Sequence, residues 1–232
     1  MKILIVNPNT TASMTTKIGA AARAVARPDT EIIASNSQNG PASIQGFLDV
    51  ATCVPGLLEE VARHSDVDAI VIACFDDTGL DAVRTLVSVP VLGIGEAAYH
   101  AASMVSNKFS VITTLSRSVP GLENNLMRYG LGQKCARVRA TDIPVLKLEE
   151  GDPATLTKIR TEIRAAIEQD NAEAIVLGCA GMADLMAELS GEFGLPIIDG
   201  VAAGITFAEA LVNNGLRTSK KGAYLTAEIS RQ

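Results

Sequence analysis

The chain repeats part of itself, and this repeat constrains its fold more than any other feature. Residues 68–74 read DAIVIAC and residues 173–179 read EAIVLGC, so the two segments are offset by 105 residues. Further along, residues 89–98 (VPVLGIGEAA) match residues 195–203 (LPIIDGVAA). Solenoid repeats are far shorter, about 20–50 residues. We therefore expect two related α/β halves.

Each half predicts the same order of alternating strands and helices. Short Val/Ile-rich runs indicate strands, and apolar residues at helical spacing indicate helices. In the first half we expect strands near 2–7, 31–35, 68–73 and 90–94, and helices near 11–26, 47–64, 79–87 and 96–106. In the second half we expect strands near 109–114, 136–141, 173–178 and 196–199, and helices near 117–128, 153–169, 181–192 and 202–214.

This alternation is typical of parallel sheets joined by right-handed crossovers, the α/β class. We expect the first half to comprise residues 1–106 together with 203–232, whose helix packs back onto it, and the second half residues 107–202. Ligands of such sheets bind at the carboxyl ends of the strands. The residues just past each strand are therefore the place to look for a site.

Composition narrows the class of protein. Hydrophobic residues make up 47% and aromatic residues only 3%, so the core must be built from Ala, Val, Ile and Leu, and the apolar excess suggests a homo-oligomer. A net charge of −6 argues against a nucleic-acid partner, which requires a basic surface. Arg217, Lys220 and Lys221 form one basic cluster, which we interpret as a solvated tail.

The opening MKILIV is short and reads as a first strand, not as a signal peptide or a membrane span. We therefore expect a cytoplasmic protein with no membrane partner, whose cysteines stay reduced. The chain has two histidines and no CxxC pair, so we expect no metal site.

Two of the four cysteines stand at equivalent positions of the repeat. Cys74 ends the third strand of the first half, and Cys179 ends the corresponding strand of the second half. A single cysteine at a strand end is most simply a small buried hydrophobe. A matched pair is harder to explain that way. Cys53 and Cys135 have no repeat partner, and we interpret them as structural.

A matched pair of thiols suits inversion of a stereocentre by proton transfer. One group takes the proton from one face of the carbon and the other returns a proton to the opposite face. Thiols titrate near pH 8.5, so small shifts let a thiolate and a thiol coexist. A helix N-terminus directly after Cys74 and Cys179 would favour their thiolates. Asp76 and Asp77 should disfavour the thiolate of Cys74, so we expect Cys179 to be the readier base. The simpler role of both carboxylates is to cap the helix that begins near Thr78.

Polar residues follow several other expected strands. The turn that contains Asn9 can cap the next helix or offer donors to a carbonyl oxygen or an anion, and both can hold together. The Gly/Pro-rich loop 40–46 can form a wall of the same site, with Ser43 as a polar contact. Thr113 and Thr114 end the first strand of the second half and mirror the Asn9 turn.

These residues resemble the hydantoin/allantoin racemases of the aspartate/glutamate racemase superfamily. The motifs that carry the resemblance are NPNT at 7–10, GPxSIxG at 40–46, ACF at 73–75, PVxGIGE at 90–96, VxTT at 111–114, LGCAGM at 177–182 and PIIDG at 196–200. The resemblance implies two pseudo-symmetric α/β domains with the active site between them, no cofactor, and Cys74 and Cys179 as the catalytic pair. It further implies that the substrate is lined by Asn9, Ser43, Ile44, Phe75, Thr113, Thr114, Gly181 and Met182.

The same resemblance narrows the substrate. Amino-acid racemases of the superfamily commonly carry Thr and His after the second cysteine, where this chain has Ala180 and Gly181. A neutral cyclic ureide therefore fits better than a zwitterion, because its carbanion is stabilised by hydrogen-bond donors at the ring carbonyl. We expect a thiolate to remove the C5 proton of a 5-monosubstituted hydantoin.

Several alternatives remain open. Allantoin racemase would use the same mechanism on another 5-substituent. Arylmalonate decarboxylase and maleate isomerase belong to the same superfamily and would also use a strand-end cysteine, although a decarboxylase needs only one. A small-molecule binding protein would have no need of paired thiols. A redox thiol protein would form a disulfide between Cys74 and Cys179 under mild oxidant.

Overall fold

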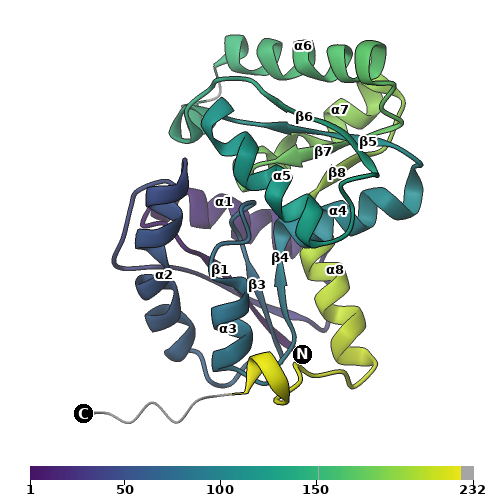
Figure 1. Ribbon diagram of the computed structural model, residues 1–232. Coiled ribbons are helices and arrows are strands. Elements are labelled where there is room, and N and C mark those ends of the chain that lie inside the picture. Colours follow the sequence, from purple (N-terminus) through teal and green to yellow (C-terminus); the bar gives the residue numbers. More distant parts are fainter. Residues whose placement is uncertain (151, 226–232) are drawn as a thin grey trace.

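The computed structural model describes residues 1–150 and 152–225, which form two α/β halves, each around a four-stranded parallel sheet (Figure 1). In the first sheet the order is β2-β1-β3-β4, from β1 (Lys2–Asn7), β2 (Glu31–Asn36), β3 (Ala69–Ile72) and β4 (Val91–Gly93). In the second the order is β6-β5-β7-β8, from β5 (Phe109–Thr113), β6 (Cys135–Ala140), β7 (Ala174–Gly178) and β8 (Ile197–Asp199). The expected α/β class and the duplicated plan are confirmed.

Helices cover both faces of each sheet, because alternate strand residues point to opposite sides. The first half contains α1 (Ala12–Val25), α2 (Phe47–Ala62), α3 (Leu80–Leu86) and α4 (Ile94–Val105), and the second contains α5 (Val119–Arg128), α6 (Pro153–Asp170) and α7 (Met186–Phe193), followed by α8 (Gly200–Asn213). Along β1, Ile3 packs in the core that includes Ile18 of α1, while Leu4 packs in the core that includes Leu57 of α2. Both faces of β1 are therefore buried.

One apolar core joins the two halves. Tyr99 of α4 is fully buried, and its ring packs edge-on against Phe75 at 5.3 Å and stacks on Phe109 of β5 at 6.2 Å between centroids. The same core continues to Val71 of the first sheet and Val176 of the second. This continuity fixes the strand ends of one half against those of the other.

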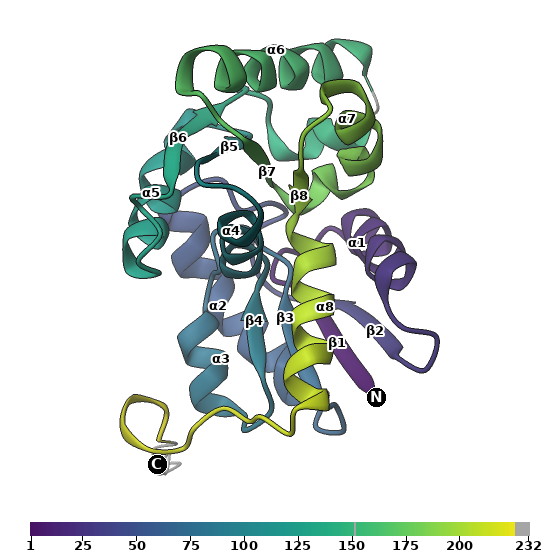
Figure 2. The ribbon, with the colours of Figure 1, turned by 90° about the vertical axis from the view of Figure 1, so that its right-hand side faces the viewer.

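Helix α8 follows β8 of the second half and packs against α1, α4 and β3 of the first (Figure 2). The domain division expected from the sequence places this helix with the first half. The boundaries themselves stay predictions, and residues 226–232 of that division lie outside the described residues.

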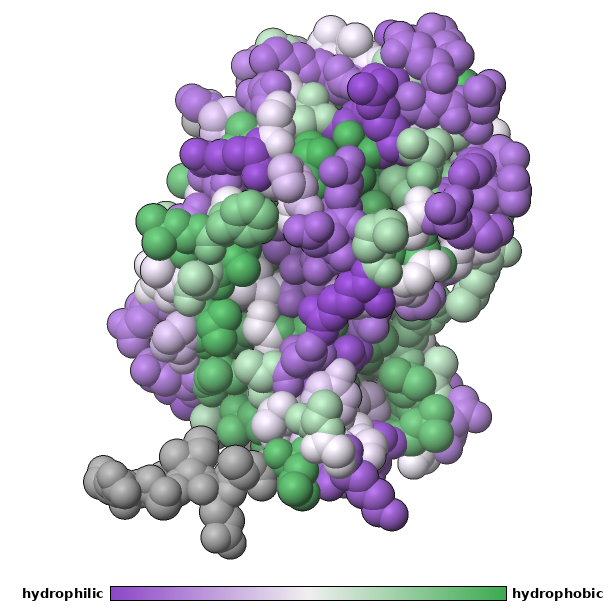
Figure 3. Space-filling view, viewed as in Figure 1, coloured by the Kyte–Doolittle hydropathy of each residue, from purple (hydrophilic) through white to green (hydrophobic). Residues whose placement is uncertain are grey.

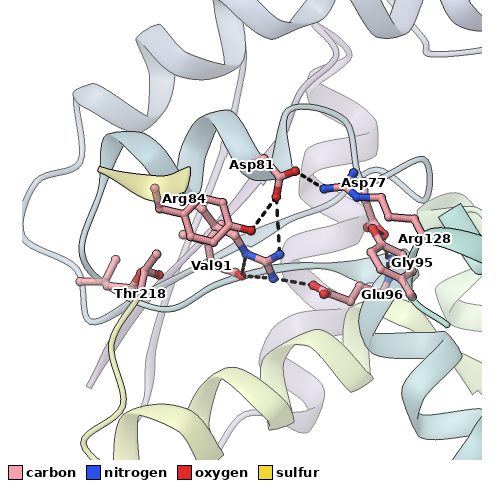
Figure 4. Close-up of polar contacts among 11 residues, drawn as sticks. Asp77, Asp81, Arg84, Val91, Gly95, Glu96, Arg128 and Thr218 are labelled. Carbon is pink, nitrogen blue, oxygen red and sulfur yellow. Dashed lines mark hydrogen bonds and ion pairs between the residues drawn. The ribbon is translucent and has the colours of Figure 1, made fainter. Parts of the chain in front are cut away.

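The segment after α8 is tied to the first half. Lys220 Nζ donates to the main-chain oxygens of Arg84 and Thr85 at 2.7 and 2.9 Å. The expectation that this lysine belongs to a solvated tail is therefore wrong. The Arg84 guanidinium binds Glu96 at 2.6 Å, and Asp81 accepts hydrogen bonds from Tyr224 and from Arg128 of α5 (Figure 4). These polar contacts link α3, α4 and α5 with the segment that contains Lys220 and Tyr224.

The helix expected at 181–192 differs from the structure. Residues Ala180–Leu185 form a 3-10 turn, and the α-helix starts at Met186. The Met182 amide donates to the Cys179 carbonyl at 3.0 Å, the tighter i to i+3 bond of that conformation. No helix in the described part of the chain has the length and apolarity that a membrane span requires.

Candidate active site

A cavity of about 40 Å³ lies where the carboxyl ends of strands from both halves meet, and both repeat cysteines line it. We call it the thiol cavity. Its lining residues are Asn9, Met14, Ile44, Ala73, Cys74, Phe75, Asp76, Thr113, Thr114, Ser118, Val145, Gly178, Cys179 and Ala180. The repeat thus brings the two thiols together, one from each half.

Cys74 reaches the thiol cavity from the end of β3. Its Sγ lies 3.6 Å from the Thr78 hydroxyl and 3.9 Å from Oδ2 of Asp76. Burial raises the pKa of this thiol well above its usual value, and the negative charge of Asp76 raises it further. Helix α3 begins only at Leu80, so the helix N-terminus expected directly after Cys74 is absent. That helix therefore does not lower the pKa of Cys74, which burial raises.

Cys179 directly follows strand β7, in a different electrostatic setting. Burial raises the pKa of its thiol to about 11, while the Gly181 amide, which donates to the sulfur, lowers it. The charge of Asp76 raises this pKa as well, and Lys17 lowers it. Lys17 is held nearby, with Nζ 3.3 Å from the Gly181 oxygen and 3.0 Å from Asp184. The environment of Cys179 therefore favours a thiolate more than that of Cys74.

Asp77 does not cap the helix that follows it, contrary to the sequence-based expectation. It is buried and accepts hydrogen bonds from the amides of Gly95 (2.9 Å) and Glu96 (2.7 Å) and from the Tyr129 hydroxyl (2.7 Å). It thus caps α4, while α3 begins at Leu80, after the N-cap residue Gly79, without a side-chain cap. Asp77 adopts a left-handed φ of 51°. Its side chain contacts α4 of the first half and Tyr129 of the second, so the residues after Cys74 are tied to both halves.

Asp76 does not cap α3 either, and sequence reasoning missed it as a cavity residue. Its carboxyl group lines the thiol cavity, and burial raises its pKa to about 6. The main-chain oxygen of Asp76 accepts a hydrogen bond from Asn125 of the second half at 2.8 Å. The rule that ligands bind just past the carboxyl ends of the strands singled out Cys74. The same rule could have identified Asp76, two residues further along.

The polar groups of the thiol cavity are suited to bind a carbonyl oxygen. The side-chain oxygen of Asn9 is occupied by the Asn7 amide and the Thr11 main-chain amide, both at 2.9 Å, and this fixes the orientation of the Asn9 side chain. Its NH₂ group contacts only the Met14 sulfur, at 3.3 Å, among the described residues. Thr113 is buried on the opposite half and donates to the Gly178 oxygen at 3.2 Å. The weakly bound Asn9 amide is a donor available to a ligand.

Five of the eight expected substrate-lining residues line the thiol cavity: Asn9, Ile44, Phe75, Thr113 and Thr114. Ser43, Gly181 and Met182 do not. Ser43 accepts a hydrogen bond from Gln45, and a Cβ added at Gly181 would lie 3.6 Å from the Cys179 sulfur. Met182 is fully buried in the apolar core of the second half, because the 3-10 turn points its side chain inward.

The other two cysteines lie elsewhere. Cys53 is fully buried in α2, and Cys135 starts β6. Burial raises their pKa to about 11 and about 12, respectively. All four thiols are free, and no cluster of His, Cys, Asp or Glu among the described residues could hold a metal ion.

Comparisons with known proteins agree with this geometry. Residues 3–208 match the family described as Asp/Glu/Hydantoin racemase. Hydantoin racemases from Rhizobium meliloti and Pseudomonas sp. (strain NS671) are 48% and 45% identical, covering 99% and 97% of this chain and 96% and 91% of their own lengths.

Solved structures give the same result. Allantoin racemase from Pseudomonas fluorescens superimposes with a TM-score of 0.96 at 40% identity, covering 100% of this chain and 99% of its own. Allantoin racemase from Klebsiella pneumoniae gives 0.95 at 46% identity, covering 98% and 94%. An arylmalonate decarboxylase gives 0.63 at 17% identity, covering 93% and 94%, which is a likeness of fold alone.

Proposed function

Because the chain belongs to the Asp/Glu/hydantoin racemase family, we propose that it racemises 5-monosubstituted hydantoins by proton transfer at C5 between two cysteines. The observation that carries the proposal is that Cys74 and Cys179, each from its own half, line one small cavity. A binding module has no need of two such thiols, and a redox pair would join them in a disulfide, whereas both are free here. The proposal uses them as acid and base.

In the proposed reaction the Cys179 thiolate removes the C5 proton and becomes a thiol. The electron pair of the broken C–H bond delocalises onto the C4 oxygen, which the Asn9 amide can bind as the charge develops. The Cys74 thiol then delivers its proton to the other face of C5 and becomes a thiolate. For the opposite enantiomer the two cysteines exchange roles. Protons and charge balance, since one thiol and one thiolate are present before and after.

The neighbours of the two thiols support this assignment of resting states. Burial favours the protonated form of Cys74, and the negative charge of Asp76, whose Oδ2 lies 3.9 Å from the sulfur, favours it further. Burial raises the pKa of Cys179 to about 11, but the Gly181 amide and the positive charge of Lys17 both favour its thiolate. Cys179 is therefore the easier of the two thiols to deprotonate and is the proposed base.

Allantoin, whose 5-substituent is a ureido group, is the alternative substrate for the same mechanism. It is favoured by the match to two allantoin racemase structures at 40% and 46% identity. The contribution of Ser43, Gly181 and Met182 to substrate binding, a cytoplasmic location, a homo-oligomer and cofactor independence stay predictions.

Purified protein and one enantiomer of a 5-substituted hydantoin in heavy water test the proposal. We expect optical rotation to decay while deuterium appears at C5, at a rate well above a sample without protein. Rotation that decays without exchange at C5 would refute proton transfer. Retention of rotation with all 5-substituted hydantoins and with allantoin would refute the racemase function.

A further inference from the structure

The thiol cavity is closed on most sides, and two of its residues reach towards the solvent. Every residue that lines it is buried except Asp76 and Cys179, which are partly exposed. One route to solvent therefore runs past Cys179 itself. Cys74 is only 8% exposed, so a proton that travels between its sulfur and the solvent needs another group to carry it.

A second cavity, of about 170 Å³, adjoins the thiol cavity and shares Asp76 and Ser118 with it. We call it the outer cavity, because Phe47, one of its lining residues, is 63% exposed. In the space-filling view, hydrophobic surface over the start of α2 lies beside hydrophilic surface over α5, and residues of both helices line the outer cavity (Figure 3). One water molecule needs only about 10–15 Å³, so water can reach Asp76 from this side.

The carboxyl group of Asp76 lies between the two cavities. Its Oδ2 lies 3.9 Å from the Cys74 sulfur, within hydrogen-bonding reach of a thiol. A Cβ added at Gly121, which lines the outer cavity, would lie 3.6 Å from Oδ1. One oxygen thus faces the thiol and the other faces the outer cavity. Asn125 helps to hold this position, since its NH₂ donates to the Asp76 main-chain oxygen at 2.8 Å.

We propose that Asp76 is the proton relay that returns Cys74 to its thiol form between turnovers. This inference rests on the proposed function, because a turnover that starts at Cys179 leaves Cys74 as a thiolate and Cys179 as a thiol. Before the same enantiomer can react again, Cys74 must gain a proton and Cys179 must lose one. Asp76 supplies the proton that Cys74 gains, and Cys179 releases its own proton to solvent.

In the relay step the O–H bond of protonated Asp76 breaks and an S–H bond forms on Cys74. The carboxylate that remains takes a proton at Oδ1 from a hydronium ion in the outer cavity, which becomes water, so protons and charge balance. Rotation of the carboxyl group then brings this proton to the side of Cys74. Burial raises the pKa of Asp76 to about 6, while the hydrogen bond from Cys74 lowers it. A group with such a pKa takes up and releases protons readily near neutral pH.

Arg117 is the other charged residue that lines the outer cavity. Its guanidinium stays protonated at all working pH values, so it cannot carry a proton in and out. Asp76 is therefore the residue of this wall that can change its protonation state.

Deuterium labelling tests the relay separately from the overall rate. A racemic, unlabelled 5-substituted hydantoin at saturating concentration would be incubated in heavy water with the wild type, Asp76→Asn or Glu123→Gln. Chiral chromatography with mass spectrometry then measures deuterium at C5 of each enantiomer. In the wild type both thiols exchange with solvent between turnovers, so both enantiomers should gain deuterium at the same rate.

Asp76→Asn should make the labelling unequal. Without the relay, Cys74 keeps the proton that it takes from one substrate molecule and returns it to the next. The enantiomer that receives its proton from Cys74 should gain deuterium at least about tenfold more slowly than the other, since a positioned proton-transfer group contributes about 10²–10⁴-fold to its step. A purely structural role of Asp76 would slow the labelling of both enantiomers together. Equal labelling of both enantiomers by Asp76→Asn would overturn the relay.

Glu123→Gln is the matched control, because Glu123 lies on α5 close to Asn125 but is exposed and lines neither cavity. It replaces a carboxylate by an amide in the same way and should label both enantiomers equally. Unequal labelling by this variant would contradict the assignment to Asp76.

Formate gives a second test, since Asp76→Ala leaves space in which a small carboxylate can carry the proton. Formate should remove the labelling difference in this variant, and chloride at equal ionic strength should leave it; a difference that formate does not change would contradict proton transfer through the carboxyl group. Failure of the relay alone is distinguishable, because the wild type would still racemise and label both enantiomers. A wild type that labels neither enantiomer would overturn the proposed function and the relay with it.

Discussion

The hydrogen bonds to buried Asp77 predict a large effect from the loss of one oxygen atom. Tyr129→Phe removes the donor that lies 2.7 Å from Oδ2 of Asp77 and creates no cavity. A hydrogen bond to a charged group contributes about 1.5–3 kcal/mol, so we expect the free energy of unfolding to fall by about 2 kcal/mol. The turn that carries Cys74 should also loosen, and kcat should fall with it.

The pH dependence of this loss has a definite sign. Burial raises the pKa of Asp77 to about 7, while the Tyr129 hydrogen bond lowers it. In the wild type, this group's contribution to stability therefore falls as pH rises from about 4 to about 7, because the folded state keeps a proton that the unfolded state has released. Without Tyr129 the pKa of Asp77 rises further and the fall continues to higher pH. The variant should thus lose more stability at pH 8.5 than at pH 6.

A double-mutant cycle isolates the interaction. Asp77→Ala leaves the amides of Gly95 and Glu96 without their acceptor and should cost about 3–5 kcal/mol. In that background Tyr129→Phe should cost less than about 0.5 kcal/mol, since its partner is already gone. Urea unfolding followed by circular dichroism at both pH values measures all four proteins. Equal costs of Tyr129→Phe in the two backgrounds would refute the reasoning.

Three further predictions follow from packing and charge. Gly200→Ala places a Cβ 2.5 Å from the main-chain oxygen of Ile94, so thermal or urea unfolding should show a loss of about 3 kcal/mol; a neutral effect would contradict the close approach of α4 and α8. Iodoacetamide at pH 9 should alkylate Cys179 before Cys74, as read by peptide mass spectrometry, because the Gly181 amide and Lys17 lower the pKa of Cys179 while Asp76 lies 3.9 Å from the Cys74 sulfur; the reverse order would contradict Cys179 as the readier base. Cys53→Ala should keep kcat/KM and lose about 1 kcal/mol of stability, whereas loss of activity in the folded variant would place Cys53 in the mechanism.

The strands and the paired thiols were predictable because they depend on local pattern. Uninterrupted Val/Ile runs end at Cys74 and Cys179, and a strand buried on both faces tolerates little else. The repeat then placed both cysteines at equivalent strand ends. The thiol cavity that both of them line follows from parallel topology without any knowledge of the loops.

The roles of Asp76 and Asp77 were not predictable, because both depend on distant segments. Asp77 finds its donors 18 and 19 residues later, at the start of α4, and a further donor in Tyr129, directly after α5. Local sequence could suggest only the cap of the next helix. The position of Met182 also depends on more than local pattern: its side chain turns into the core because a 3-10 turn replaces the first turns of the expected helix.

Val145 and Ser118 also line the thiol cavity, but they belong to connecting segments and do not directly follow a strand. Ser118 follows the Thr113–Thr114 strand end by four residues, so a wider search of that turn could have found it. Val145 belongs to residues 143–146, which correspond in the repeat to the loop 40–46, so the repeat could have indicated its position.

Enantiomer-specific exchange at C5 tests the two-base account most directly. Cys74→Ser and Cys179→Ser would each be incubated in heavy water with either enantiomer of a 5-substituted hydantoin, and deuterium at C5 and optical rotation followed together. The account predicts that each variant loses racemisation but exchanges the proton of one enantiomer only, and that the two variants choose opposite enantiomers. Exchange of both enantiomers by a single variant, or full racemisation by either, would contradict it.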